Sequence, residues 1–192
     1  MNALQDVSHL LVSSLAGFYL GLLWLRFLLQ FLHADFYNPV SQFVERWTRV
    51  PLRPLRRLLP ATGRVDLAAL LLILLIKLLE LSLYAAVEAH TLLPAPQLIF
   101  LAIFALLSQL LYFYQGAVIL LMIMSWVVAA GGYHAVYALL AEITEPLCAP
   151  ARRIIPPMGG LDLSIMLVFL GIQIAEVLLQ HLGNLLGAAL GL

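Results

Sequence analysis

The chain has 192 residues, of which 64% are hydrophobic and only 10% are charged, and its formal net charge is zero. A soluble domain carries about 25% charged and about 45–50% apolar residues, so this composition excludes an ordinary soluble fold and indicates an integral membrane protein. The neutral charge gives no sign of a nucleic-acid partner, and the single cysteine excludes an intrachain disulfide.

Four stretches are apolar enough to cross a bilayer, which requires about 20 residues in a helix. In chain order they cover residues about 8–32, about 65–87, about 104–130 with a lead-in from 97, and about 162–182 or longer. The third stretch is too long for a straight span, so we expect a strong tilt, an interfacial lead-in or a kink at Gly116. The predicted fold class is an all-α membrane protein with four transmembrane helices.

The chain consists of two tandem copies, because a shift of 96 residues aligns its halves without a gap. Between Pro54 and Leu67 the shift gives seven identities in fourteen positions, which chance matching of leucines cannot produce. The matched pairs of the repeated motif are Pro54 with Pro150, Arg56 with Arg152, Arg57 with Arg153, Pro60 with Pro156, Gly63 with Gly159, and Asp66 with Asp162. We therefore predict repeats 1–96 and 97–192, related by a two-fold axis along the membrane normal.

Each repeat holds an amphipathic Pro/Arg-rich segment between its two spans, at residues about 38–64 and about 134–161. Because arginines gather there, the positive-inside rule predicts that both segments are cytoplasmic and that both termini lie outside. Pro51, Pro54 and Pro60 are expected to break the first segment into short helical pieces. The arginines act either as a topology anchor, which we favour on the sequence because any cytoplasmic loop carries this bias, or as a dock for anionic lipid or an acidic partner.

Asp66 and Asp162 stand just before apolar runs, where a helix N-cap belongs. We favour capping over a catalytic role, and each carboxylate can also pair with the Arg-Arg of its own copy. We identify no nucleotide loop, no metal-ligand spacing and no nucleophile–base constellation, and therefore predict no catalytic residue, metal or cofactor.

Ionisable side chains inside the predicted spans are costly and seek partners. The repeat register places four polar residues at one depth, and these are Lys77, Glu80, Gln173 and Glu176. Lys77 and Glu80 can pair within one helix, whereas Glu176 requires Gln173, another partner or a proton. The group is either an interhelical lock, which we favour, or a cation or proton site. Arg26 lies nearer a helix end and is expected to snorkel to the interface.

Small residues recur every four positions near both ends of the chain. The two stripes are Ser13, Gly17 and Gly21, and Gly183, Gly187 and Gly191. Such stripes allow helices to approach closely, so we expect them to pack against each other or in a homo-oligomer.

The motifs PLRPLRRLLP (51–60) and TEPLCAPARRIIPPMGGLDLS (144–164) resemble the signature of the YggT/YlmG family of small bacterial and plastid membrane proteins. The resemblance covers nearly the whole chain, although Gly63-Arg64 stands where the family has Gly-Gly. It implies a multi-pass protein of the bacterial inner membrane. It also implies loose links to osmotic stress, cell division and plastid haem assembly, without a mechanism.

Two functions remain open on these residues. The first is a non-enzymatic membrane assembly or scaffold factor, whose Arg/Pro segments engage anionic lipid or a membrane or cytoplasmic protein client. The alternative is a small oligomeric cation or proton channel linked to osmotic stress, which would use the intramembrane polar group.

Overall fold

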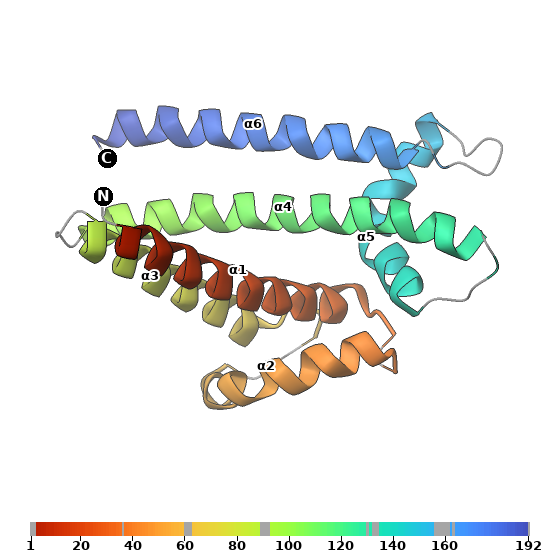
Figure 1. Ribbon diagram of the computed structural model, residues 1–192, viewed down its shortest axis with the longest axis horizontal. Coiled ribbons are helices and arrows are strands. Elements are labelled where there is room, and N and C mark those ends of the chain that lie inside the picture. The colour runs from red at the N-terminus through yellow and green to blue at the C-terminus, as the bar shows by residue number, and fades with distance from the viewer. Residues whose placement is uncertain are drawn as a thin grey trace.

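The computed structural model describes residues 3–35, 37–59, 63–88, 93–129, 131, 135–155, 162 and 164–191. The described residues form six helices and no strand. In chain order the helices are α1 (Ala3–Leu32), α2 (Pro39–Leu58), α3 (Leu67–Glu88), α4 (Ala95–Ala129), α5 (Ala135–Ile154) and α6 (Ser164–Leu190). Both chain ends lie at one end of the long helices, as four crossings require (Figure 1).

The four long apolar helices confirm the predicted membrane spans. Each of α1, α3, α4 and α6 contains a stretch long and apolar enough to cross a bilayer. The third span is one continuous 35-residue helix that includes Gly116, and the ribbon of α4 shows no sharp kink along its length (Figure 1). A helix of that length rises about 52 Å, so it must tilt or protrude from a hydrocarbon core of about 30 Å.

The surface segments are regular helices, so the predicted break at the prolines is wrong. Both α2 and α5 are 20 residues long and contain two internal prolines, Pro51 and Pro54 in α2. Each proline removes one backbone hydrogen bond, which in α2 frees the carbonyls of Trp47 and Val50. Trp47 and Val50 are exposed, so these carbonyls can find partners outside the fold and the helix continues.

The corner between α1 and α2 follows from local backbone chemistry. His33 has a left-handed φ of 56°, and the amide of Ala34 reaches back to the Leu29 carbonyl at 3.0 Å. This is the usual way to close a helix C-terminus, although glycine is the commoner residue there. Asn38 then caps α2 by accepting a hydrogen bond from Val40, with Pro39 as the first helical residue.

Each copy packs its three helices on one another in the same way. In the first copy α1, α2 and α3 contact one another, as α4, α5 and α6 do in the second. The fully buried Leu52 of α2 lies in the core of the first copy. Its counterpart Cys148, 96 positions later, occupies the core of the second, so the single thiol is a packing residue.

The contacts between the copies correct the predicted two-fold relation. In the described chain α3 contacts α4 and α1 contacts α5, but the counterpart contacts, α6 with α1 and α2 with α4, are absent. Only six residues separate Glu88 from Ala95, and a short connection makes α3 and α4 antiparallel neighbours. No such connection ties α6 to α1. The counterpart helices also meet, α1 with α4 and α2 with α5, but the interface as a whole is heterologous because α3 takes part in it and α6 does not.

Candidate functional site

The repeated motif forms one ion pair in each copy, between the surface helix and the start of the next span. Arg56 Nη2 is 2.5 Å from Asp66 Oδ2, and Arg152 Nε is 2.9 Å from Asp162 Oδ2. In both copies the two partners are ten positions apart in the sequence. The pair links the last turn of the surface helix to the start of the following span, as the sequence predicts.

Both aspartates also hold the first turn of the next helix. Asp66 accepts a hydrogen bond from the Ala69 amide at 3.1 Å, and Asp162 accepts one from the Ser164 amide at 3.0 Å. Burial opposes ionisation of Asp162, but hydrogen bonds from Ser164 and Arg152 outweigh it and hold the pKa of Asp162 below its ordinary value. The prediction that Asp66 and Asp162 cap the following helices is therefore confirmed.

A buried arginine extends the ion pair of the first copy into a network. Arg26 Nη2 lies 2.6 Å from Glu45 Oε2, and Arg26 Nη1 donates to the Thr48 hydroxyl at 2.6 Å. Its Nε lies 4.0 Å from Asp66. Only 7% of the Arg26 side chain is exposed, so the prediction that it snorkels is wrong. We call Arg26, Glu45, Thr48, Asp66 and Arg56 the Arg26 network.

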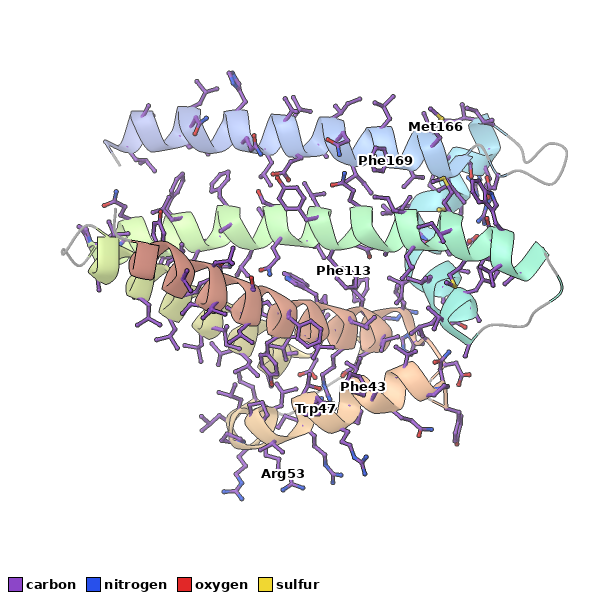
Figure 2. All side chains as sticks on the ribbon, in the orientation of Figure 1. Phe43, Trp47, Arg53, Phe113, Met166 and Phe169 are labelled. Atoms are coloured by element: carbon purple, nitrogen blue, oxygen red, sulfur yellow. The ribbon has the colours of Figure 1, made fainter. Side chains whose placement is uncertain are left out.

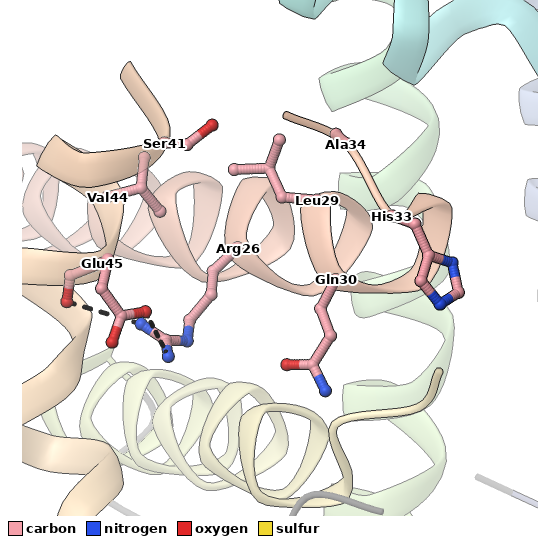
Figure 3. Close-up of a pocket in the computed structure, with 8 residues that line it drawn as sticks. All are labelled: Arg26, Leu29, Gln30, His33, Ala34, Ser41, Val44 and Glu45. Atoms are coloured by element: carbon pink, nitrogen blue, oxygen red, sulfur yellow. Dashed lines mark hydrogen bonds and ion pairs between the residues drawn. The ribbon is translucent and has the colours of Figure 1, made fainter. Parts of the chain in front are cut away.

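The Arg26 network borders a small pocket in the corner between α1 and α2. The pocket has a volume of about 270 Å³ and is mainly apolar. Figure 3 shows Arg26 and Glu45 joined in it, with Gln30 and His33 further along α1. Because its charges already neutralise each other, the pocket offers no free charge to a ligand.

The second copy lacks this network because its key residues are replaced. Met122 stands at the counterpart of Arg26, and Ala141 at the counterpart of Glu45. Arg152 instead makes a second ion pair with Glu145 of its own helix, at 2.7 Å, in a more exposed position. Because Arg26 and Glu45 are both charged in the first copy and both replaced by apolar residues in the second, comparing the copies could have predicted that they form an ion pair.

The outward face of α2 carries an arginine stripe. Spacings of three, four and four residues place the stripe on one side of the helix, and its members are Arg46, Arg49, Arg53 and Arg57. All four are exposed, and none makes an ion pair or hydrogen bond with another described residue. Figure 2 shows Arg53 pointing away from the bundle. Four cations are thus left unneutralised on one helix face.

The counterpart face of α5 has a different charge. Glu142, Glu145, Ala149 and Arg153 stand where α2 has the arginine stripe. Glu142 accepts a hydrogen bond from the Asp35 amide at 3.1 Å, and Asn38 donates to the Ala135 carbonyl at 2.8 Å. The acidic face of α5 therefore helps to join the copies, whereas the basic face of α2 is free.

The intramembrane polar group is divided by the fold. Lys77 and Glu80 form the predicted ion pair at 2.8 Å. However, α4 lies between α3 and α6, which do not contact each other in the described chain, so Gln173 and Glu176 are not part of one site with them. Glu176 accepts a hydrogen bond from Gln180 at 2.9 Å rather than from Gln173, and it interacts with Tyr112 of α4.

The two small-residue stripes do not meet each other. Gly183 faces Phe104 of α4, and a Cβ there would lie 3.0 Å from the ring. Gly187 is buried, whereas Gly191 follows the end of α6 and faces open space. Gly17 and Gly21, which follow Ser13 on α1, have no neighbouring atom within 4 Å of an added Cβ.

Three residues of the repeated motif, Pro60, Pro156 and Gly159, lie outside the described residues. Pro54 and Pro150 lie inside the surface helices, and Gly63 adopts a left-handed φ of 75° ahead of α3. Arg57 and Arg153 are exposed and unpaired in the described chain. Its histidine, cysteine and acidic side chains form no group that could hold a metal ion.

Comparison with known proteins gives one family and several bacterial relatives. The CCB3/YggT family model matches residues 6–87 and 100–183, which are the two copies. A Pseudomonas aeruginosa protein is 38% identical over 93% of this chain and 90% of its own length. A Vibrio alginolyticus protein is 36% identical over 92% of this chain and 94% of its own length. YggT of Escherichia coli K12 is 37% identical over 92% of this chain and 93% of its own length. No solved structure matches the chain.

Proposed function

We propose that this chain, which belongs to the CCB3/YggT family, is a non-enzymatic membrane scaffold whose arginine stripe on α2 binds anionic phospholipid headgroups. The observation that carries the proposal is the set of four exposed, unpaired guanidinium groups on one face of a helix fixed to the ends of two spans. The stripe is set apart from the structural arginines Arg26, Arg56 and Arg152, which have acidic partners inside the fold.

The position of α2 favours a lipid headgroup as the ligand. The helix joins the end of α1 to the start of α3 and packs on both, so we expect it to lie near the phosphate groups of a bilayer. A guanidinium group matches a phosphate with paired N–H donors. Each basic residue near an anionic surface contributes about 1 kcal/mol of attraction, so four together give a strong preference for anionic lipid.

The intramembrane residues support a scaffold more than a channel. Lys77 and Glu80 neutralise each other in an ion pair of 2.8 Å, and Glu176 accepts a hydrogen bond from Gln180 of its own helix. A conducting site needs ionisable groups that reach a water-filled path. The paired and separated arrangement is that of local locks within a membrane scaffold.

Lipid binding can be measured by native mass spectrometry in micelles containing equal amounts of phosphatidylglycerol and phosphatidylcholine with the same acyl chains. We expect the protein to retain phosphatidylglycerol preferentially. Replacing Arg46, Arg49, Arg53 and Arg57 together with Gln should lower that preference about tenfold or more. An unchanged preference in a variant that keeps its helicity would refute the proposal.

The matched control replaces the same four arginines with Lys, which retains the charge but not the fork of donors. It should keep most of the preference for the anionic lipid. On the unmodified protein, raising the salt concentration should weaken the preference, because exposed charges are screened. A preference that resists both salt and the Gln substitutions would place the lipid elsewhere on the molecule.

The proposal includes an orientation, with α2 and α5 on the cytoplasmic side of a bacterial inner membrane. The arginines at that end motivate it through the positive-inside rule. An Arg53→Cys substitution in a Cys148→Ala chain provides one exposed thiol. A membrane-impermeant maleimide should label it only after cells are opened, and labelling of intact cells would reverse the orientation.

A further inference from the structure

Two aromatic side chains of α2 lie uncovered beside the arginine stripe. Phe43 is 48% exposed and Trp47 is 58% exposed, and their ring centroids are 6.0 Å apart. Figure 2 shows both on α2, at one edge of the molecule. We call this pair the aromatic knob.

The counterparts of the aromatic knob in the second copy are fully covered. Leu139 and Ile143 of α5 are 3% and 1% exposed, and they pack in one core cluster with Leu28 and Leu29 of α1. The chain therefore contains one complete example of this contact, between the second copy's surface helix and the first copy's first span. The aromatic knob lacks the equivalent because α2 does not contact α4.

The surface that would complete the second example is also free. The counterpart of Leu29 is Ser125 of α4, which lines an apolar groove of about 500 Å³ between α4 and α6. The groove also includes Trp126 and Met166, which are both largely exposed. Met166 and Phe169, which line the groove, lie on α6 at the edge of the molecule opposite the aromatic knob (Figure 2).

A like-for-like comparison of α3 and α6 shows which helix face is uncovered. Leu70, Leu74 and Leu78 of α3 are partly buried, whereas their counterparts Met166, Leu170 and Ile174 are exposed. The difference arises because α3 contacts a helix of the other copy, α4, whereas α6 contacts no helix of the first copy in the described chain. The groove and this face of α6 together form one continuous apolar surface.

We propose that this surface binds a second copy of the chain, whose aromatic knob enters the groove at Ser125 as Leu139 and Ile143 meet α1 within one chain. The contact repeats a heterologous interface, so the chains associate head to tail rather than about a two-fold axis. Groove and knob lie at opposite edges of one molecule, so one chain cannot fill its own groove. Van der Waals packing of this kind drives helix association in lipid.

The test uses cysteine cross-linking in membranes, in a Cys148→Ala chain without other thiols. One chain carries Phe43→Cys and the other, with a different affinity tag, carries Ser125→Cys. After oxidation the two should cross-link to each other several-fold more than either cross-links to itself. Leu79→Cys on the exposed face of α3, combined with Ser125→Cys, is the matched control and should give no product.

Trp47→Ala should lower the share of oligomers in native mass spectra several-fold while the arginine stripe keeps its preference for anionic lipid. If the Trp47→Ala variant fails to fold, the cross-link between Phe43→Cys and Ser125→Cys chains still tests whether the aromatic knob enters the groove. Dominant cross-links between two Phe43→Cys chains would show a two-fold contact and overturn the proposal. Absence of cross-links together with a purely monomeric protein would also overturn it and would leave lipid as the occupant of the groove.

Discussion

The two copies hold the same Arg–Asp pair in different surroundings: Arg56 and Arg152 are about equally exposed, at 32% and 33%, but Asp66 is buried in the Arg26 network and Asp162 is partly exposed. Asp66 is fully buried and is shared by Arg26 and Arg56, while Asp162 keeps 22% of its side chain exposed and binds Arg152 alone among the basic residues described. The same motif can therefore be fixed by a membrane-embedded arginine or by a surface glutamate. The comparison separates what both copies need from what only one has added.

The surface helices differ in the same systematic way. The free face of α2 is basic and the counterpart face of α5 carries Glu142 and Glu145. The aromatic knob of α2 is exposed and its counterpart on α5 is buried. We infer that the basic and aromatic faces of α2 are left for outside contacts, whereas the counterpart faces of α5 help to join the two copies. Four pairs of substitutions can break or sharpen this comparison.

The largest effect is expected from Asp66→Asn compared with Asp162→Asn. The first removes the buried carboxylate that faces both Arg26, which is itself buried, and the partly exposed Arg56, and it should cost about 3–5 kcal/mol of stability. The second affects a partly exposed carboxylate and should cost about 1–3 kcal/mol. Thermal unfolding in detergent measures both, and equal losses would contradict the distinction between a buried and a partly exposed carboxylate.

A smaller loss is expected when the first copy receives the residues of the second. Arg26→Met alone leaves Glu45 unpaired and should cost about 2–3 kcal/mol. Adding Glu45→Ala, the residue type of Ala141, should recover at least half of that loss, because a buried ion pair can often be replaced by apolar residues. A double variant no more stable than Arg26→Met would show that Arg26 acts mainly through Thr48 or Asp66.

Lys77→Gln introduces the residue type of Gln173 and removes the partner of Glu80 inside the membrane. The uncompensated carboxyl group should lower stability by about 2 kcal/mol, with proton uptake limiting the loss. Glu176→Gln should change stability by less, because its remaining oxygen can still accept from Gln180. Chemical unfolding in micelles at constant pH compares the two, and the reverse order would indicate that Glu176 has a partner in the lipid phase or a second chain.

The smallest effects are expected at two glycines and should have opposite signs. Gly183→Ala forces the Phe104 ring to move and should destabilise the protein by about 1 kcal/mol. Gly17→Ala meets no atom and should stabilise α1 by about 0.5–1 kcal/mol through helix propensity. Thermal unfolding of the monomeric fraction provides the comparison. A loss at Gly17 would show that the open side of α1 is covered in the native membrane protein.

Sequence reasoning found the elements whose signals are local or repeated. Apolar length revealed the four spans, and the constant shift of 96 residues revealed the partners Arg56 with Asp66 and Arg152 with Asp162. It missed the role of Arg26 because Glu45 and Thr48 lie 19 and 22 residues away on another helix, beyond any periodicity. It wrongly expected the prolines to break α2, because it did not foresee that the residues whose carbonyls they free, Trp47 and Val50, would be exposed.

The arrangement of the two copies was the least accessible to prediction. The similarity of the two copies suggested that both would use the same surface to contact each other, as a pseudo-two-fold axis requires. However, the short link from Glu88 to Ala95 makes α3 and α4 neighbours, and no such link brings α6 next to α1. The four polar residues predicted to form one intramembrane group consequently lie apart, because residues at the same depth in a membrane need not lie on helix faces that contact each other. Lys77 and Glu80 were predictable as a pair only because both lie on α3.

The unequal lengths of α3 and α4 have a consequence for the bilayer. The 22-residue α3 rises about 33 Å and the adjoining 35-residue α4 about 52 Å. No single hydrocarbon thickness matches both helices, and mismatch is relieved by tilting or by deforming the surrounding lipid. A membrane containing this protein should therefore be thinner beside one copy than beside the other. Such a thickness gradient would sort longer acyl chains to one flank of the molecule and shorter ones to the opposite flank.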